Sequence, residues 1–125
     1  MSLETPLHRV QGLGAAHTGT QHFWRQRVTA VAMVPLAIWF VISALQFVGA
    51  PGFAVTTFFQ HPTNAALMGI FIVIMLYHMQ IGLQSVIDDY VHHTGLKIFF
   101  LLFNRGAALL IGVTSIIALL RIAIA

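Results

Sequence analysis

Residues 63–90, TNAALMGIFIVIMLYHMQIGLQSVIDDY, decide the fold of this chain. In the first 25 residues of this stretch, up to Ile87, the only ionisable side chains are Tyr77 and His78. About 20 apolar residues are enough for a helix to cross the roughly 30 Å of hydrocarbon in a bilayer. In lipid, a helix is also the way in which one segment satisfies its own backbone hydrogen bonds. The stretch is therefore predicted to be a transmembrane helix.

Two further stretches have similar length and character. Residues 28–49 contain no charge over 22 positions, and residues 98–120 are apolar except where Asn104 and Arg105 interrupt them. The whole chain of 125 residues is 58% hydrophobic and only 7% charged, whereas soluble domains carry about 25% charged residues. The composition therefore excludes an ordinary soluble domain and indicates an integral membrane protein.

We expect an all-α membrane protein with three transmembrane helices, at about residues 28–49, 63–87 and 98–120. These helices form one membrane domain over residues 28–125, and Pro35 can kink the first of them. Residues 1–27 contain glycines and arginines but no sustained apolar period. They are expected to form a polar and largely irregular tail.

The cations indicate how the chain crosses the membrane. Arg9, Arg25 and Arg27 precede the first span. Lys97 lies in the second connector, whereas the other side has only Arg121. Because cytoplasmic segments carry the excess of Lys and Arg, we expect a cytoplasmic N-terminus and a C-terminus on the opposite side.

Several classes of protein and site are not expected. The first apolar run starts at residue 28 and is too long for the apolar part of a signal peptide, so no cleaved signal peptide is predicted. The net charge of +3 lies next to apolar runs and forms no dense basic face, which argues against nucleic-acid binding. Cysteine is absent, so disulfides and thiolate metal ligands are excluded.

His78 is an ionisable group deep in the second span. It lies ten residues before Asp88, about 15 Å along a helix axis and so near mid-membrane. At about 100° per residue, Gly82, Ser85 and Asp89 each lie within about 40° of His78 around the helix and form one stripe with it. The small residues leave room for a flat macrocycle whose iron meets the imidazole. The same pattern is typical of a histidine that hydrogen-bonds a neighbouring helix across small packing residues.

A haem at this position would need a second chain. No other histidine lies inside a predicted span, so a bis-histidine haem with His78 takes its second ligand from a partner subunit or from a second copy of the chain.

The rim cluster of Asp88, Asp89 and Tyr90 has two interpretations. Tyrosine is common at the membrane–water interface, where it anchors a helix. Carboxylates at a helix C-terminus oppose the helix dipole, however, so they do not stabilise the helix. A phenol at the hydrocarbon boundary could instead donate a hydrogen bond to a lipid-soluble carbonyl compound such as a quinone, with a carboxylate beside it to orient it or to relay protons.

Other polar side chains near the same rim also have alternative interpretations. Arg27 is a cytoplasmic anchor of the first span or a partner for an anionic group such as a haem propionate. Arg105 lies about 10 Å inside the third span, and it can reach back to the interface or pair with an acidic group. His92 and His93 are expected in an exposed loop, where they could move protons near neutral pH. Four further histidines have no assigned role: His8, His17, His22 and His61.

Two segments carry a resemblance to a known family. RQRVTAVAMVPLAIWFV (residues 25–41) and YHMQIGLQSVIDDYVHH (residues 77–93) resemble the small hydrophobic membrane anchor subunit of succinate dehydrogenase, respiratory complex II. The resemblance covers essentially the whole chain, and its specific part is the H-x₃-G-x₆-D-Y pattern from His78 to Tyr90.

The resemblance implies roles for four residues. His78 matches the axial ligand of a b-type haem held between this subunit and a cytochrome b subunit. Tyr90 matches a tyrosine that hydrogen-bonds ubiquinone, and Asp89 matches its acidic neighbour. Arg27 matches an arginine near the haem propionates and the quinone pocket. The motif assigns no role to Asp88, Arg105, His92 or His93.

The resemblance also implies partners and a location. A flavoprotein subunit with FAD would oxidise succinate, and an iron–sulfur subunit would carry the electrons to ubiquinone at the cytoplasmic ends of these helices. The expected location is the bacterial inner membrane, with the chain as a multi-pass subunit in contact with lipid. Three alternatives remain: a quinol:fumarate reductase anchor, a haem-free structural anchor, and a small transporter subunit, which the lack of a carboxylate inside the spans disfavours.

Overall fold

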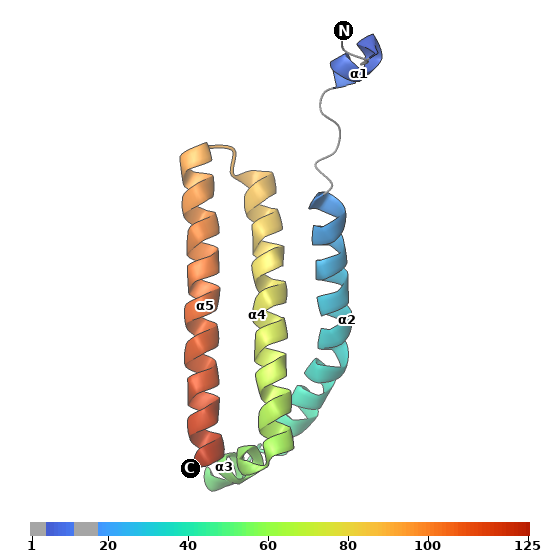
Figure 1. Ribbon diagram of the computed structural model, residues 1–125. Coiled ribbons are helices and arrows are strands. Elements are labelled where there is room, and N and C mark those ends of the chain that lie inside the picture. Colours follow the sequence, from blue (N-terminus) through green and yellow to red (C-terminus); the bar gives the residue numbers. More distant parts are fainter. Residues whose placement is uncertain (1–4, 12–17) are drawn as a thin grey trace.

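The computed structural model describes residues 5–11 and 18–125, and within these ranges the chain is helical, with no strand (Figure 1). The described helices are α1 (Pro6–Gln11), α2 (Thr18–Leu45), α3 (Phe53–Gln60), α4 (Pro62–Tyr90) and α5 (Thr94–Ile124). Three segments are long and apolar enough to cross a membrane: Gly19–Leu45, Pro62–Tyr90 and Thr94–Ile124. The prediction of an all-α membrane protein with three spans is therefore confirmed. His17 and part of the predicted tail lie outside the described residues.

The three long helices extend beyond the apolar stretches that predicted them. They contain 28, 29 and 31 residues, which corresponds to about 42 to 47 Å of helix, close to a full bilayer with its headgroup regions. The prediction of a largely irregular tail is wrong at residues 6–11, which form α1, and at residues 18–27, which belong to α2. Residues 20–27, TQHFWRQR, contain no proline or glycine to end a helix, so α2 continues through them toward its N-terminus.

The turns between the helices follow from local sequence. Gly49 has a φ of 76°, in the left-handed region that favours glycine, and it lies in the turn that follows α2. Pro62 occupies the first turn of α4, where its missing N–H leaves no helical hydrogen bond unmade. The connector between α2 and α4 also contains the short helix α3, which the sequence did not predict.

Helix α4 lies between α2 and α5 and packs against both (Figure 1). Its contact with α5 is close, because a Cβ on Gly112 of α5 would meet Leu76 Cδ1 of α4 at 3.2 Å. Asn104 of α5 is 7% exposed, and its side-chain amide donates a hydrogen bond of 3.0 Å to the backbone carbonyl of Gln80. Helices α4 and α5 therefore form a hairpin whose apolar interface contains this side-chain-to-backbone hydrogen bond.

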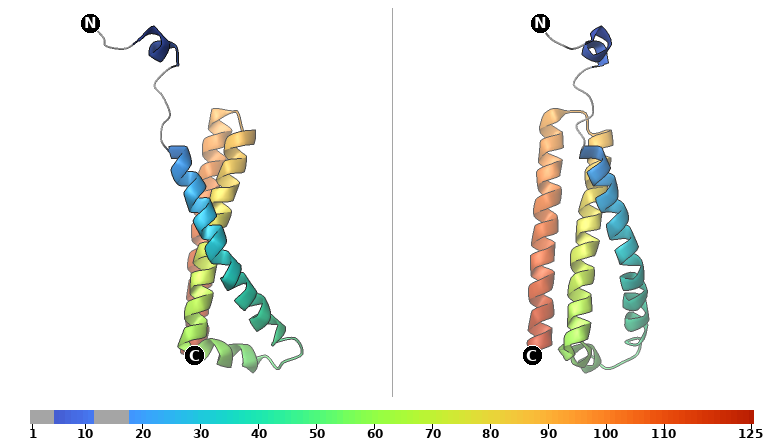
Figure 2. Two further views of the ribbon diagram at one scale, coloured as in Figure 1. Left: turned by 90° about the vertical axis from the view of Figure 1, so that its right-hand side faces the viewer. Right: turned by 45° about the vertical axis from the view of Figure 1, so that its right-hand side comes forward.

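Helix α2 crosses α4 obliquely and diverges from it toward its own C-terminal end (Figure 2). Two aromatic contacts hold this more open end of the bundle. The rings of Phe40 and Phe71 lie 5.2 Å apart, and Trp39 stacks on Phe58 of α3 at 6.3 Å. Most large apolar side chains of the three long helices face outward, as expected where the solvent is lipid or an apolar partner chain.

The two ends of the bundle differ in the number of cations that they carry. The start of α2 and the connector between α4 and α5 lie at one end, whereas α3 and the C-terminus lie at the other (Figure 1). The first end carries Arg25, Arg27 and Lys97, and the second carries Arg121. Three of these four cations thus lie at one end of the bundle and one at the other, which is the asymmetry from which the orientation in the membrane is predicted.

Candidate functional site

His78 lies inside the membrane-spanning part of α4 and is half-buried against α2. It precedes Tyr90, the last residue of α4, by 90 − 78 = 12 positions, or about 18 Å of helix. Its Nδ1 atom is 2.9 Å from the hydroxyl oxygen of Thr29 on α2. Among the residues that the structure describes, its other ring nitrogen, Nε2, has no hydrogen bond. The imidazole is thus held through one nitrogen and free at the other.

A continuous uncovered surface of α4 begins beside His78. At about 100° per residue, five residues fall within an arc of about 80° that neither α2 nor α5 covers. We call this surface the open face of α4: Met75, Met79, Gly82, Val86 and Tyr90. Its large side chains are exposed, and a Cβ on Gly82 would meet no atom of another segment within 4 Å. One helical turn beyond His78, the helix surface is therefore flat and unobstructed.

The residues around His78 suit haem iron. An imidazole nitrogen is a common axial ligand of haem, and the porphyrin supplies the four equatorial ligands itself. A bare metal ion is a poor fit, because no group of three or more His, Cys, Asp or Glu side chains among the described residues could hold one. A free Nε2 next to an open surface at Gly82 would let a flat macrocycle lie along α4.

The predicted stripe of His78, Gly82, Ser85 and Asp89 is divided between two surfaces. His78 borders the open face and Gly82 belongs to it, whereas Ser85 and Asp89 line a polar cleft between the helices. The cleft, of about 690 Å³, has twelve lining residues: Gly19, Gln21, His22, Arg25, Tyr77, Gln80, Ile81, Gln84, Ser85, Asp88, Asp89 and Arg105. Its mixed charges would hold water or a polar group at the end of the bundle that carries the arginines.

The charged residues of the cleft are arranged differently from the sequence expectation. Asp88 forms an ion pair of 2.9 Å with Lys97 at the start of α5, and this pair is too exposed to contribute much stability. Arg105 lines the cleft with both aspartates, but no ion pair joins it to either within the described part of the chain. The Nε2 atom of His22 is buried and has no partner among the described residues.

Tyr90 and Asp89 face different surfaces although they are neighbours in sequence. Tyr90 is 79% exposed on the open face, whereas Asp89 lines the cleft. Successive helical residues point about 100° apart, so the two side chains do not form a pair with each other.

Arg27 and the loop histidines make no hydrogen bond with His78 among the described residues. The guanidinium of Arg27 lies over the ring of Phe23, 5.2 Å from its centroid, and no contact joins it to His78 in the described ranges. His92 is exposed. His93 precedes α5, and its Nδ1 atom accepts a long hydrogen bond of 3.4 Å from the backbone N–H of Leu96. His93 thus caps a helix, a role that the sequence did not predict.

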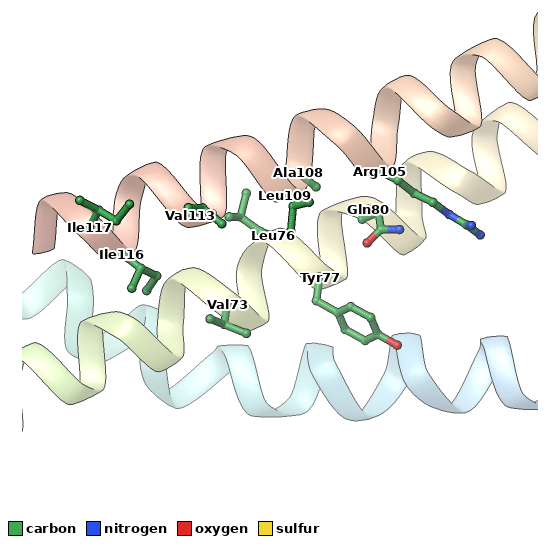
Figure 3. Close-up of a pocket in the computed structure, with 11 residues that line it drawn as sticks. Val73, Leu76, Tyr77, Gln80, Arg105, Ala108, Leu109, Val113, Ile116 and Ile117 are labelled. Atoms are coloured by element: carbon green, nitrogen blue, oxygen red, sulfur yellow. The ribbon is translucent and has the colours of Figure 1, made fainter. Parts of the chain in front are cut away.

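An apolar groove adjoins the polar cleft. It lies along α4 and α5 and has a volume of about 630 Å³. Figure 3 shows Tyr77, Gln80 and Arg105 at one end of it, with Val73, Leu76 and several α5 residues along its length. These three polar residues also line the cleft. The combined surface, charged at one end and apolar along the rest, has the character of a site for an amphiphile.

Sequence reasoning missed the contact of Thr29 with His78 and the place of His22 in the cleft. The missing information was the start of α2. Thr29 lies 29 − 18 = 11 residues into α2, and His78 lies 12 residues before the end of α4. Because α2 and α4 run antiparallel, the start of α2 and the end of α4 lie at the same end of the bundle, and Thr29 and His78 are at similar distances from it. A prediction that began α2 at Thr18 would therefore have placed the two residues at the same level.

Comparison with known proteins identifies the relatives of this chain. The family described as succinate dehydrogenase/fumarate reductase transmembrane subunit matches residues 1–121. A succinate dehydrogenase hydrophobic membrane anchor subunit from Paracoccus denitrificans is 35% identical over 86 residues, which cover 69% of this chain and 67% of the relative. The corresponding subunit of Rickettsia bellii is 28% identical over 66% of each chain. A succinate dehydrogenase membrane anchor subunit from Reclinomonas americana is 28% identical over 74% of this chain and 79% of the relative. No solved structure matches.

Proposed function

The chain belongs to the succinate dehydrogenase/fumarate reductase transmembrane subunit family, and we propose that it is the membrane anchor of a succinate:ubiquinone oxidoreductase that shares a b-type haem and a quinone site with its partner subunits. It is a multi-pass integral membrane protein. The proposed location is the bacterial inner membrane, with the start of α2 and the end of α4 on the cytoplasmic side.

The observation that carries this proposal is the state of His78. A histidine inside a membrane span must have a partner or a function, because lipid offers it no hydrogen bonds. Here one ring nitrogen contacts Thr29, and Nε2 remains available beside the open surface at Gly82. His78 Nε2 is the proposed axial ligand. When bound, the haem supplies a site for one electron at a time, at a potential set by its ligands and surroundings.

The second axial ligand comes from a cytochrome b subunit in this proposal. None of the five residues of the open face is a histidine. The exposed apolar side chains of that face provide a surface on which an apolar partner helix can pack. Arg27, exposed near the cationic end of α2, is the proposed contact for a haem propionate or for the quinone pocket.

The quinone site is proposed at the end of α4. Tyr90, exposed on the open face, would donate its phenolic hydrogen to a quinone carbonyl oxygen at the boundary with the partner subunits. Asp89, in the polar cleft on the adjoining side of the helix, would connect this region to water and protons. Because the two side chains lie on different surfaces, they would have different tasks: Tyr90 would bind the quinone, and Asp89 would supply protons.

The overall reaction divides its electrons and protons among subunits. Oxidation of succinate to fumarate in a flavoprotein subunit with FAD releases two electrons and two protons. An iron–sulfur subunit passes the two electrons to the membrane. The quinone takes up two electrons and two protons to become a quinol. This chain contributes membrane attachment, haem ligation and part of the quinone pocket.

The test is a reduced-minus-oxidised absorption spectrum of the purified complex. The wild-type complex is expected to show a b-type haem signal, and His78→Ala is expected to abolish or strongly reduce it. His92→Ala, which removes an exposed imidazole from the connector, serves as the control and should keep the signal. A wild-type complex without the signal, or an unchanged signal in His78→Ala, would refute the ligand assignment.

A second candidate is a quinol:fumarate reductase anchor, because the description of the matching family names both enzymes. The same haem and quinone chemistry serves both directions. The ratio of succinate–quinone to quinol–fumarate rates, measured on the same purified complex, distinguishes them.

A further inference from the structure

We propose that Thr29 is a positioning residue for the haem ligand: its hydroxyl fixes the tautomer of His78 and holds the potential of the bound haem down. This inference rests on the haem ligation proposed above and adds to it a residue of α2 that no sequence motif singles out.

The direction of the hydrogen bond follows from counting protons. The Thr29 hydroxyl oxygen lies 2.7 Å from the backbone carbonyl oxygen of Arg25 and 3.1 Å from that of Gln26. Carbonyl oxygens only accept, and a hydroxyl has a single proton to donate. That proton is directed to the carbonyls of α2. The contact of 2.9 Å with His78 must then be a hydrogen bond that Nδ1–H donates to the Thr29 oxygen.

This direction determines which nitrogen can bind iron. A neutral imidazole carries one N–H, so a proton on Nδ1 leaves the lone pair on Nε2. The bond also restricts rotation of the ring, because it ties His78 to a helix 49 positions away in the sequence. Both residues are only part-exposed, which strengthens the bond relative to water. The ligand is therefore oriented before any iron arrives.

The bond has an electronic consequence. Metal-binding histidines commonly donate their second N–H to an oxygen, which makes the ring a stronger donor to the metal. Donation by Nδ1–H into a hydroxyl that is itself polarised by the Arg25 carbonyl makes the ring a stronger electron donor to iron. A stronger donor favours ferric over ferrous iron. Loss of the Thr29 hydroxyl should thus raise the midpoint potential of the haem.

The experiment replaces the hydroxyl in the intact complex. Thr29→Val keeps the shape and removes the oxygen, Thr29→Ala removes it without adding bulk, and Thr29→Ser keeps it. Thr114→Val is the matched control, since the Thr114 hydroxyl makes the same bonds to its own helix, 2.8 and 3.0 Å to the carbonyls of Leu110 and Ile111. The measurements are haem content, the midpoint potential from a redox titration, and the electron paramagnetic resonance spectrum of the ferric haem.

The expected pattern separates the hydroxyl from the side-chain volume. Thr29→Val and Thr29→Ala lose haem by about tenfold in affinity, or retain it at a raised potential with altered resonance. A tenfold change in the relative affinity for ferric and ferrous iron corresponds to about 59 mV for this one-electron couple. Thr29→Ser and Thr114→Val match the wild type.

The outcomes that overturn the inference are distinct from those that overturn the proposed function. Full haem at an unchanged potential in Thr29→Val and Thr29→Ala refutes the role of Thr29 and leaves the haem ligation intact. A Thr29→Ser variant as defective as Thr29→Val also refutes it, because the hydroxyl would then not be the operative group. A wild-type complex without haem refutes the ligation by His78 and the inference together.

Discussion

Replacement of Gly82 by leucine should expel haem without harming the chain itself. Gly82 lies one turn beyond His78 on the open face of α4, and a Cβ there would meet no atom of another segment within 4 Å. Leucine is also the better helix former, by somewhat less than the roughly 0.8 to 1 kcal/mol that separates glycine from alanine on soluble-helix scales. The isolated subunit therefore has no internal reason to be destabilised by Gly82→Leu.

A bound macrocycle would make the same substitution unfavourable for haem binding. If a porphyrin lies against Gly82, the leucine side chain occupies its space, and overpacking of a close contact costs about 1 to 3 kcal/mol. At about 1.4 kcal/mol per factor of ten, haem affinity should fall by about 5- to 140-fold. Gly82→Ala, with a single methyl group, should give a smaller loss in the same direction.

The assay measures haem per complex from the reduced-minus-oxidised spectrum, together with the thermal stability of the purified complex. Gly106→Leu is the control, because Gly106 of α5 also has no atom of another segment within 4 Å of an added Cβ. Wild-type haem content and an unshifted spectrum in Gly82→Leu would refute the placement of the macrocycle along this part of α4.

Two further predictions concern the quinone site and the α4–α5 interface. Tyr90→Phe, which removes the exposed phenolic oxygen and leaves the ring, should impair quinone reduction but spare succinate oxidation measured with a soluble artificial acceptor; equal losses in both assays would mean that the tyrosine is structural. Asn104→Ala removes the amide that donates to the Gln80 carbonyl and should lower the free energy of unfolding by about 0.6 kcal/mol, and at most about 1.7 kcal/mol. Denaturation of the purified complex measures this change. The comparison is Asn64→Ala, which removes a similar hydrogen bond of 3.0 Å to the Phe58 carbonyl near the opposite end of the bundle. A larger loss of unfolding free energy in Asn64→Ala than in Asn104→Ala would contradict the stabilising role of the Asn104 amide in the α4–α5 interface.

The number and type of helices could be predicted from the sequence because the bilayer imposes a local rule. A segment in hydrocarbon must be apolar over about 20 residues and must satisfy its own backbone, and both properties are visible in a short window. The helix ends were predicted poorly for the same reason. Residues 18–27 carry no sustained apolar pattern, yet they form the first turns of α2, before the apolar stretch that predicted the helix.

The sequence also indicated His78 as a candidate functional residue, because an ionisable group within a span is unusual. It did not determine what His78 faces. The single stripe that the helical period predicted is divided in the structure, with Ser85 and Asp89 in the cleft and Gly82 on the open face.

By itself, the sequence determined the membrane class, the three spans and the place of His78 along its helix, since each depends on residues close together in the chain. Tertiary structure decided the contact of His78 with Thr29 and the uncovered surface at Gly82. The rotation of a helix about its own axis is set by how its side chains pack against neighbouring helices. That packing joins residues 49 positions apart, a separation at which the hydropathy of either segment carries no information about the other.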